Sequence, residues 1–223
     1  MTRVHIICEG PTEETFVNEV LGPHLASFDV FPYASLVGKP GHKGGRVSTA
    51  RMARDITYRL LGDRTAWCTT FFDFYGLDSK FVGQGEAAKK SSYEDKAQTI
   101  ESALQYHVRA MTDENTVLRF IPYIQMYEFE GLLFSDPAKL ASGLYIEDFK
   151  TKFQAIRNSF NTPEEINDSR MTAPSKRILK LMPSYEKPLY GSLAAIEVGL
   201  ETIRRECKRF DAWVGILEDL KDI

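Results

Sequence analysis

Apolar residues in the first half of the chain alternate between short β-branched runs and longer stretches with helical spacing. The short runs predict strands at Arg3–Cys8, Val30–Val37, Ala66–Phe74 and Val117–Met126. The longer stretches predict helices at Thr12–Ala26, Val47–Leu61 and Tyr93–Met111. Strands separated by helical crossovers are typical of an α/β fold with a parallel sheet and helices on both faces. Pro32 places the second strand at an edge of that sheet.

The pattern changes after residue 142, because no strand-like run follows Gly143. Prolines punctuate a series of helical stretches, which predict helices at Ile146–Ser159, Pro163–Asp168, Pro174–Met182, Leu193–Cys207 and Ala212–Leu220. We therefore expect an α/β domain over 1–142 and a helical C-terminal region over 143–223 that packs on it.

Composition excludes several classes of protein. Of the 223 residues 43% are hydrophobic, which is enough for a core, and the net charge of -3 excludes nucleic-acid binding by bulk positive charge alone. No apolar run reaches the roughly 18 residues that a membrane helix needs, and no signal peptide is evident. Three scattered cysteines argue against a disulfide framework or a zinc site. We expect a cytoplasmic protein without membrane contact.

Acidic residues follow three of the predicted strands. Glu9 and Glu13 come after the first strand, Asp73 ends the third, and Glu128 and Glu130 follow the fourth. The carboxyl ends of parallel strands meet at one edge of a sheet, where ligands bind. The sequence therefore predicts that these carboxylates gather at one site.

Clustered carboxylates repel one another unless a cation holds them together. Mg²⁺ and Mn²⁺ bind carboxylates together with substrate phosphates, and such sites stabilise phosphoryl transfer. A structural reading also accounts for some of these residues, because Glu13, Glu128 and Glu130 would complement helix dipoles at first turns. Asp73 has the alternative role of a turn-forming residue.

Two basic segments are candidates for phosphate binding. The glycine-rich loop over residues 38–46 contains Lys43 and Arg46 and precedes a predicted helix, although it does not match a Walker A motif. Lys176 and Arg177 open another predicted helix behind Pro174. A solvated loop and a solvated helix face are the simpler explanations of these charges.

An ordered set of motifs in this chain resembles a known family. The motifs are EGPTEETFV, FFDFYGL, YEFEGLLFSDP, PSKRI and VGLETIRREC. They resemble bacterial Toprim-related proteins, which are similar to the nuclease domains of the overcoming-lysogenization-defect type. This resemblance implies a Rossmann-like sheet of four parallel strands and a role in phage defence beside an ABC/SMC-like ATPase. It also implies that Glu9 is a general acid/base and that Asp73 is the first metal-binding aspartate.

The chain departs from the Toprim pattern at one position. The usual Asp-x-Asp motif here reads Asp73-Phe74-Tyr75, so its second aspartate is missing. Asp78 would replace it only if the loop folds back. Glu9 is a candidate metal ligand as well as the general acid/base, and Glu13, Glu128 or Glu130 would otherwise complete the metal set.

Our leading hypothesis is a Mg²⁺- or Mn²⁺-dependent nuclease that cleaves phosphodiester bonds in nucleic acid. The first alternative is a non-catalytic module that binds nucleic acid or an ATPase partner through the helical tail, Leu193–Leu220. The second is a phosphoryl-transfer enzyme that acts on small substrates. The choice between DNA and RNA and the oligomeric state stay open.

Overall fold

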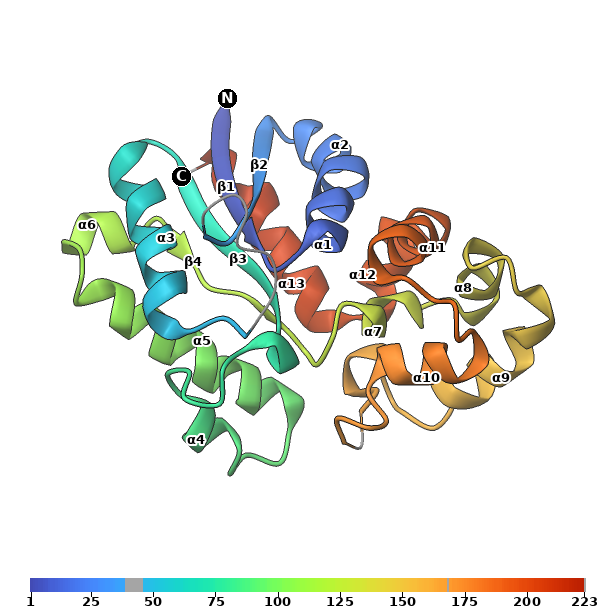
Figure 1. Cartoon of the computed structure of the whole chain (residues 1–223). Coiled ribbons are helices and arrows are strands. Elements are labelled where there is room, and N and C mark those ends of the chain that lie inside the picture. Colours follow the sequence, from blue (N-terminus) through green and yellow to red (C-terminus); the bar gives the residue numbers. More distant parts are fainter. Residues whose placement is uncertain (39–45, 168, 223) are drawn as a thin grey trace.

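The computed structural model describes residues 1–38, 46–167 and 169–222, and it has an α/β architecture around a parallel sheet (Figure 1). The strands are β1 (Thr2–Cys8), β2 (Val30–Leu36), β3 (Trp67–Asp73), β4 (Phe120–Ile121) and β5 (Ile124–Gln125). Their order is β2-β1-β3-β4, β5 also pairs with β3, and every pairing is parallel. The predicted fold class and the edge position of the strand with Pro32 are confirmed.

The fourth strand differs from the expectation over Val117–Met126. Val117 ends the short helix α6 (Glu114–Val117), and Pro122 separates β4 from β5 because it has no N–H for the ladder. The Thr70 hydroxyl bridges this gap. It donates to the Tyr123 carbonyl (2.8 Å) and accepts from the Tyr123 N–H (3.1 Å). A side chain of β3 thus replaces the missing backbone bonds and keeps the following acidic segment in place.

Helices cover both faces of the sheet, as expected (Figure 1). One face carries α1 (Pro11–Phe16), which continues through the π-helical η1 (Val17–Leu21) into α2 (Gly22–Ala26), and also α13 (Lys208–Glu218). The other face carries α3 (Thr49–Gly62) and α5 (Tyr93–Arg109). Adjacent phenylalanines in β3 show the alternation, because Phe71 packs with the first set and Phe72 with the second.

The described part of the chain after Gly143 contains no strand, so the helical character of this region is confirmed. Two helix predictions need correction. The stretch expected to be a helix from Pro163 forms only the 3₁₀ turn η4 (Pro163–Glu165). Gly199, at φ 81°, divides the expected Leu193–Cys207 helix into α11 (Ser192–Val198) and α12 (Leu200–Glu206).

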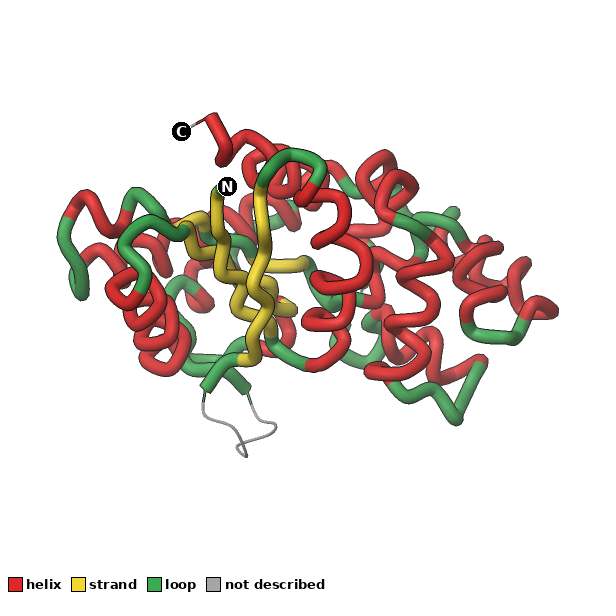
Figure 2. Tube along the Cα trace, turned by 90° about the horizontal axis from the view of Figure 1, so that it is seen from above, coloured by secondary structure: helices red, strands yellow, loops and turns green. Residues whose placement is uncertain are grey.

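The helical elements from α7 (Glu130–Leu133) to α12 form a lobe beside the sheet (Figure 1 and Figure 2). Besides α11 and α12, it contains α8 (Pro137–Gly143), α9 (Lys150–Arg157) and α10 (Pro174–Leu181). The remaining short elements of the chain are η2 (Phe74–Gly76), α4 (Gln84–Ala87), η3 (Glu147–Phe149), η5 (Lys187–Gly191) and η6 (Asp219–Asp222).

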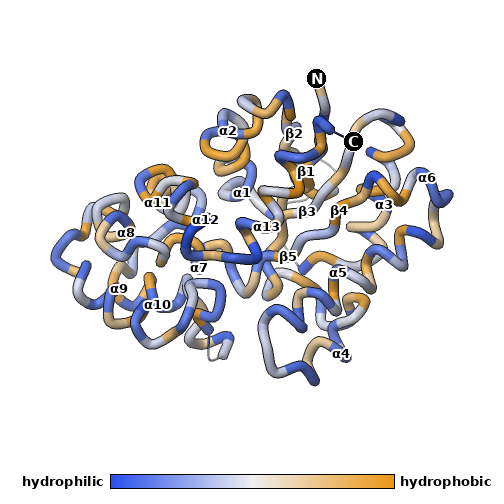
Figure 3. The backbone as a smooth tube through the Cα atoms, turned by 180° about the vertical axis from the view of Figure 1, so that it is seen from behind, coloured by the Kyte–Doolittle hydropathy of each residue, from blue (hydrophilic) through white to orange (hydrophobic). Residues whose placement is uncertain are grey.

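The last long helix returns from the lobe to the sheet. Figure 3 shows the polar stretch that joins α12 to α13 behind the molecule. In α13, Trp213 stacks on Tyr123 with ring centroids 4.4 Å apart and donates its indole N–H to the Thr69 hydroxyl (3.0 Å). A helix from the C-terminal region therefore completes the core of the α/β layer, and the division at residue 142 stays a prediction. None of the helices in the described ranges is long and apolar enough to cross a membrane.

Candidate active site

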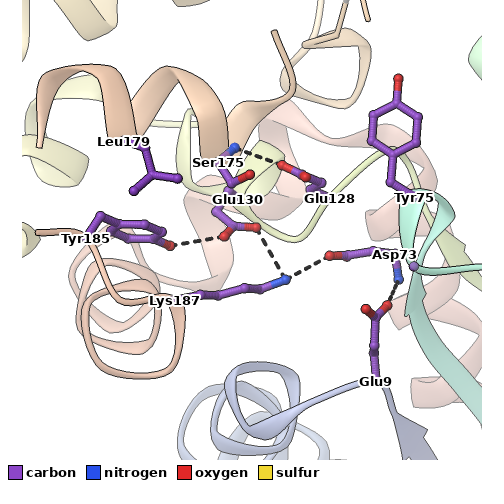
Figure 4. A pocket seen from close by; sticks show the side chains of 10 residues that line it. Glu9, Asp73, Tyr75, Glu128, Glu130, Ser175, Leu179, Tyr185 and Lys187 are labelled. Carbon is purple, nitrogen blue, oxygen red and sulfur yellow. Dashed lines mark hydrogen bonds and ion pairs between the residues drawn. The ribbon is translucent and has the colours of Figure 1, made fainter. Parts of the chain in front are cut away.

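The acidic residues that follow the strands meet at the carboxyl edge of the sheet, around a cavity of about 320 Å³ (Figure 4). Glu9 follows β1, Asp73 ends β3, and Glu128 and Glu130 follow β5. The cavity is lined by Glu9, Asp73, Tyr75, Gly76, Glu128, Glu130, Ser175, Leu179, Tyr185 and Lys187. Glu13 lies behind this lining, in the first turn of α1, and reaches the same cluster through Lys187. The structure thus brings together all five carboxylates that the sequence singled out.

Glu9 lies against a loop that leaves room for its carboxylate. Its Oε2 accepts the backbone N–H of Asp73 (3.0 Å). A Cβ added to Gly76 would lie 2.1 Å from that same oxygen, so a side chain at position 76 would displace the carboxylate. Burial raises the pKa of Glu9 to about 7; Lys187 opposes this rise and the Glu13 carboxylate adds to it. A carboxyl group with such a pKa is suited to give and take a proton at neutral pH.

Three further carboxylates are almost fully buried: Glu13 is 1%, Asp73 4% and Glu130 1% exposed. Each has one oxygen that the surrounding structure holds with a hydrogen bond. The donors to Glu13 Oε2, Asp73 Oδ1 and Glu130 Oε1 are the Gly10 N–H (3.0 Å), the Phe129 N–H (2.7 Å) and the Tyr185 hydroxyl (3.2 Å). The second oxygen of each carboxylate faces the centre of the cluster.

Lys187, from η5, supplies the positive charge at that centre. Its Nζ lies 2.8 Å from Asp73 Oδ2, 3.0 Å from Glu13 Oε1 and 3.3 Å from Glu130 Oε2. Only the contact with Asp73 has hydrogen-bond geometry. Burial lowers the pKa of Lys187, but the carboxylates of Asp73, Glu130 and Glu13 outweigh it, and the pKa lies well above its ordinary value. The ammonium therefore stays charged.

Sequence reasoning missed Lys187. It lies 114 residues from Asp73 in a proline-punctuated segment, and no motif distinguishes it from the other lysines. The one signal in the sequence was the excess of negative charge in the predicted cluster. Buried carboxylates require a counter-charge, so a basic residue had to come from elsewhere in the chain.

Glu128 connects the cluster to the predicted basic segment. Its Oε2 accepts the Ser175 N–H (2.8 Å) in the first turn of α10. Burial, with a further contribution from the Glu130 charge, raises the pKa of Glu128. Lys176 is exposed on the same helix, and Arg177 donates to the Thr172 carbonyl (2.7 Å). Neither basic residue is among those that line the cavity.

Of the glycine-rich loop over residues 38–46, the structure describes Gly38 and Arg46. Arg46 is exposed and precedes Val47, whose N–H donates to the Gly76 carbonyl (3.0 Å). Arg46 is therefore the residue before one that is hydrogen-bonded to Gly76, and Gly76 lies against the Glu9 carboxylate. Lys43 lies outside the described residues.

Neither Tyr75 nor Asp78 supplies the second aspartate of the Asp-x-Asp pattern. Tyr75 stands at that position, and its hydroxyl donates to Asn167 Oδ1. The Asp78 Oδ1 accepts the Lys80 N–H (2.8 Å) within its own turn, and Asp78 does not line the cavity. The additional carboxylates near Asp73 are those of Glu13 and Glu130.

The chemical type of these donors, but not their present arrangement around Lys187, suits a divalent cation such as Mg²⁺ or Mn²⁺. Both ions prefer carboxylate oxygens. Glu13 Oε1 and Glu130 Oε2 are buried and, within the described structure, have no hydrogen-bond partner. In the described ranges, no group of three or more Asp, Glu, His or Cys side chains is arranged so that it could hold a metal ion. The carboxylates of Asp73, Glu13 and Glu130 converge on the Lys187 ammonium.

Comparison with protein families adds one match, to a domain of unknown function, DUF4276, over residues 8–218. The chain belongs to the DUF4276 family. The matched range of DUF4276 includes every acidic residue of the cluster and Lys187. No curated protein and no solved structure matches the chain significantly. The resemblance to Toprim proteins stays a prediction.

Proposed function

We propose that this DUF4276 protein is a divalent-metal-dependent nuclease that cleaves phosphodiester bonds in nucleic acid. The observation that carries the proposal is the convergence of the Asp73, Glu13 and Glu130 carboxylates on one ammonium, beside a cavity that Glu9 and Glu128 also line. Two of the inward oxygens are buried, contact this ammonium and receive no hydrogen bond from the described residues. Buried carboxylate oxygens that receive no hydrogen bond are rare in proteins, and a ligand would satisfy them. A cation is the ligand that carboxylate oxygens require.

Each group has a role that follows from its environment. Glu9, with its pKa near 7, exchanges the proton of the attacking or leaving oxygen. Asp73, Glu13 and Glu130 would hold the metal, and Glu128, which lines the same cavity, would be an additional ligand. When bound, the metal supplies positive charge to the phosphate and lowers the pKa of water. Arg46, Lys176, Arg177 and Lys43 are the proposed contacts to backbone phosphates.

The cellular setting is also a proposal. The three cysteines are free and buried, which agrees with a reducing compartment such as the cytoplasm. The resemblance stated above suggests an ABC/SMC-like ATPase as a partner and phage defence as the process. A partner of this kind would supply nucleic acid to the cavity.

The test is cleavage of supercoiled plasmid, single-stranded DNA and structured RNA with Mg²⁺, with Mn²⁺ and with EDTA. We expect metal-dependent cutting that Glu9→Gln and Asp73→Asn abolish. The exposed Glu19 provides a matched control, because Glu19→Gln removes the same charge away from the cavity. Cutting that persists in both active-site variants would contradict the proposal. The ATPase should be added before an inactive result is accepted.

A non-catalytic binding module is the second candidate, and one observation favours it. Lys187 already partly neutralises the carboxylates, as a purely structural cluster would require. Such a module would bind nucleic acid equally well in EDTA, and Glu9→Gln would not change its affinity. The nuclease proposal predicts that binding strengthens with metal.

A further inference from the structure

Lys187 and the proposed metal compete for the same oxygens. The ammonium lies 2.8–3.3 Å from one oxygen each of Asp73, Glu13 and Glu130. These residues come from β3, α1 and α7, so three separate elements converge on a single cation. An ammonium offers three donors, yet only the bond to Asp73 has the geometry of a hydrogen bond. Lys187 therefore makes one hydrogen bond within this cluster, and its contacts with Glu13 and Glu130 are ion pairs without hydrogen-bond geometry.

The carboxylates do not depend on Lys187 for their positions. Each is held at its other oxygen, by the Gly10 N–H, the Phe129 N–H or the Tyr185 hydroxyl. If the ammonium left, the three inward oxygens would remain directed at one point. Partners of this kind, which orient a ligand through its second atom, are what a metal site requires.

Lys187, by contrast, reaches the surface with part of its side chain, although its ammonium is enclosed by the cluster. Its side chain is 30% exposed, whereas the side chains of Glu13 and Glu130 are 2% and 1% exposed. It lies at the start of η5, next to the exposed Glu186 and Pro188. A lysine has a flexible four-carbon stem and carries a strongly hydrated charge, so its head can turn to water without moving the backbone.

We propose that Lys187 is a tethered cation that fills the acidic cluster in the absence of metal and that a divalent ion displaces. This inference rests on the proposed function and adds a mode of regulation to the same site. Two cations cannot share oxygens at these distances, because their repulsion opposes joint occupation. The lysine thus stabilises the metal-free protein and lowers the affinity for metal until the ion concentration is high enough to exchange with it.

The direct test is chemical labelling of the lysines in the wild-type chain with an amine-reactive reagent, read by mass spectrometry. Labelling is compared in EDTA and at several Mn²⁺ concentrations, with Mn²⁺ binding measured by calorimetry on the same sample. The exposed Lys176 serves as the internal reference. We expect labelling of Lys187 to rise several-fold as Mn²⁺ binds, while labelling of Lys176 stays constant.

The outcomes separate the exchange from the metal site itself. If Mn²⁺ binds and Lys187 labelling stays constant or falls, the exchange is wrong and the metal site stands. If calorimetry shows no Mn²⁺ binding, the proposed metal-dependent function is wrong and the exchange falls with it.

A variant gives an independent readout. Lys187→Met keeps the length of the side chain and removes its charge, so we expect Mn²⁺ to bind about tenfold more tightly or better. Lys139→Met is the matched control, because the Lys139 ammonium contacts the Val198 carbonyl (3.3 Å) away from the cavity. Circular dichroism establishes that both variants are folded. Unchanged or weaker Mn²⁺ binding in a folded Lys187→Met protein would overturn the proposal.

Discussion

Two charged clusters in this protein each place one basic side chain among buried carboxylates, but their atoms are not equally well paired. The Arg209 guanidinium contacts Glu101 Oε1 and donates to the Ile124 carbonyl (3.0 Å). Both oxygens of Glu164 accept backbone N–H groups, from Arg209 (3.0 Å) and Phe210 (3.1 Å), at the start of α13. These charges fasten the last helix to the sheet and α5.

Around Lys187 the pairing is incomplete. Glu13 Oε1 and Glu130 Oε2 are as deeply buried as the oxygens of Glu164 but receive no hydrogen bond in the described structure. These two oxygens are ion-paired with Lys187 but lack hydrogen bonds, which are costly to leave unmade in a buried site. We therefore interpret the first cluster as a structural joint and propose the second as a ligand site. The predictions below test this contrast, from the largest expected effect to the smallest.

Removal of the Asp73 charge from the cluster around Lys187 should have the largest effect on activity. We expect Asp73→Asn to lower metal-dependent cleavage by about 10³-fold, or roughly 4 kcal/mol, because the proposed function makes Asp73 a metal ligand. Asp95→Asn on the exposed start of α5 is the control. Cleavage rates on one nucleic-acid substrate check the prediction, and equal rates in the two variants would contradict it.

Removal of the cation from the complete cluster should reduce stability, whatever the metal concentration. We expect Arg209→Met to lower the free energy of unfolding by about 3 kcal/mol, because Glu101 loses its buried partner. Urea unfolding with and without Mn²⁺ measures this loss. In Lys187→Met, by comparison, Mn²⁺ should restore the stability that the substitution removes. Restoration of both variants by Mn²⁺ would erase the contrast between the clusters.

The raised pKa of Glu9 should make the free energy of unfolding depend on pH. Its pKa in the folded chain is about 7, above the ordinary value of 4.5, so the folded state binds the proton more tightly. The resulting stability is present below pH 4.5 and is lost as the pH rises through 7. We expect the wild type to lose about 2 kcal/mol relative to Glu9→Gln between pH 4.5 and 8, after allowance for solvent screening. Urea unfolding in EDTA at both pH values tests this, and parallel curves would contradict it.

The smallest effect concerns the space beside Glu9. We expect Gly76→Ala to displace the Glu9 carboxylate and reduce cleavage about tenfold, with little loss of stability. Gly62→Ala, where an added Cβ meets no atom within 4 Å, is the control. Cleavage rates and thermal melting curves distinguish the two substitutions, and equal cleavage rates would show that the close approach at Gly76 has no function.

The carboxyl edge could be predicted because it depends on local patterns. Once Arg3–Cys8 and Ala66–Phe74 are assigned as parallel strands, Glu9 and Asp73 must lie at the same edge. The break at Pro122 was hidden within an apolar run, and the hydroxyl that bridges it belongs to Thr70 on another strand. No local pattern reports such a contact.

Lys187 and the packing of α13 depend on contacts that are distant in sequence. The indole of Trp213 meets Thr69 across 144 residues, and Lys187 meets Asp73 across 114. Helical periodicity identifies an apolar face but not the surface that covers it. The candidate ligands were therefore available from the sequence, whereas their counter-charge was not.

The return of α13 to the sheet has a consequence for the order in which the protein is made. A ribosome synthesises the strands, the acidic residues and Lys187 before it reaches Trp213. Until α13 is made, Phe71 and Tyr123 lack the Trp213 ring that packs against both of them. Domains fold as units during synthesis, so the nascent chain carries its complete set of acids before its core can be completed. The helix that closes the sheet is made only after every proposed ligand.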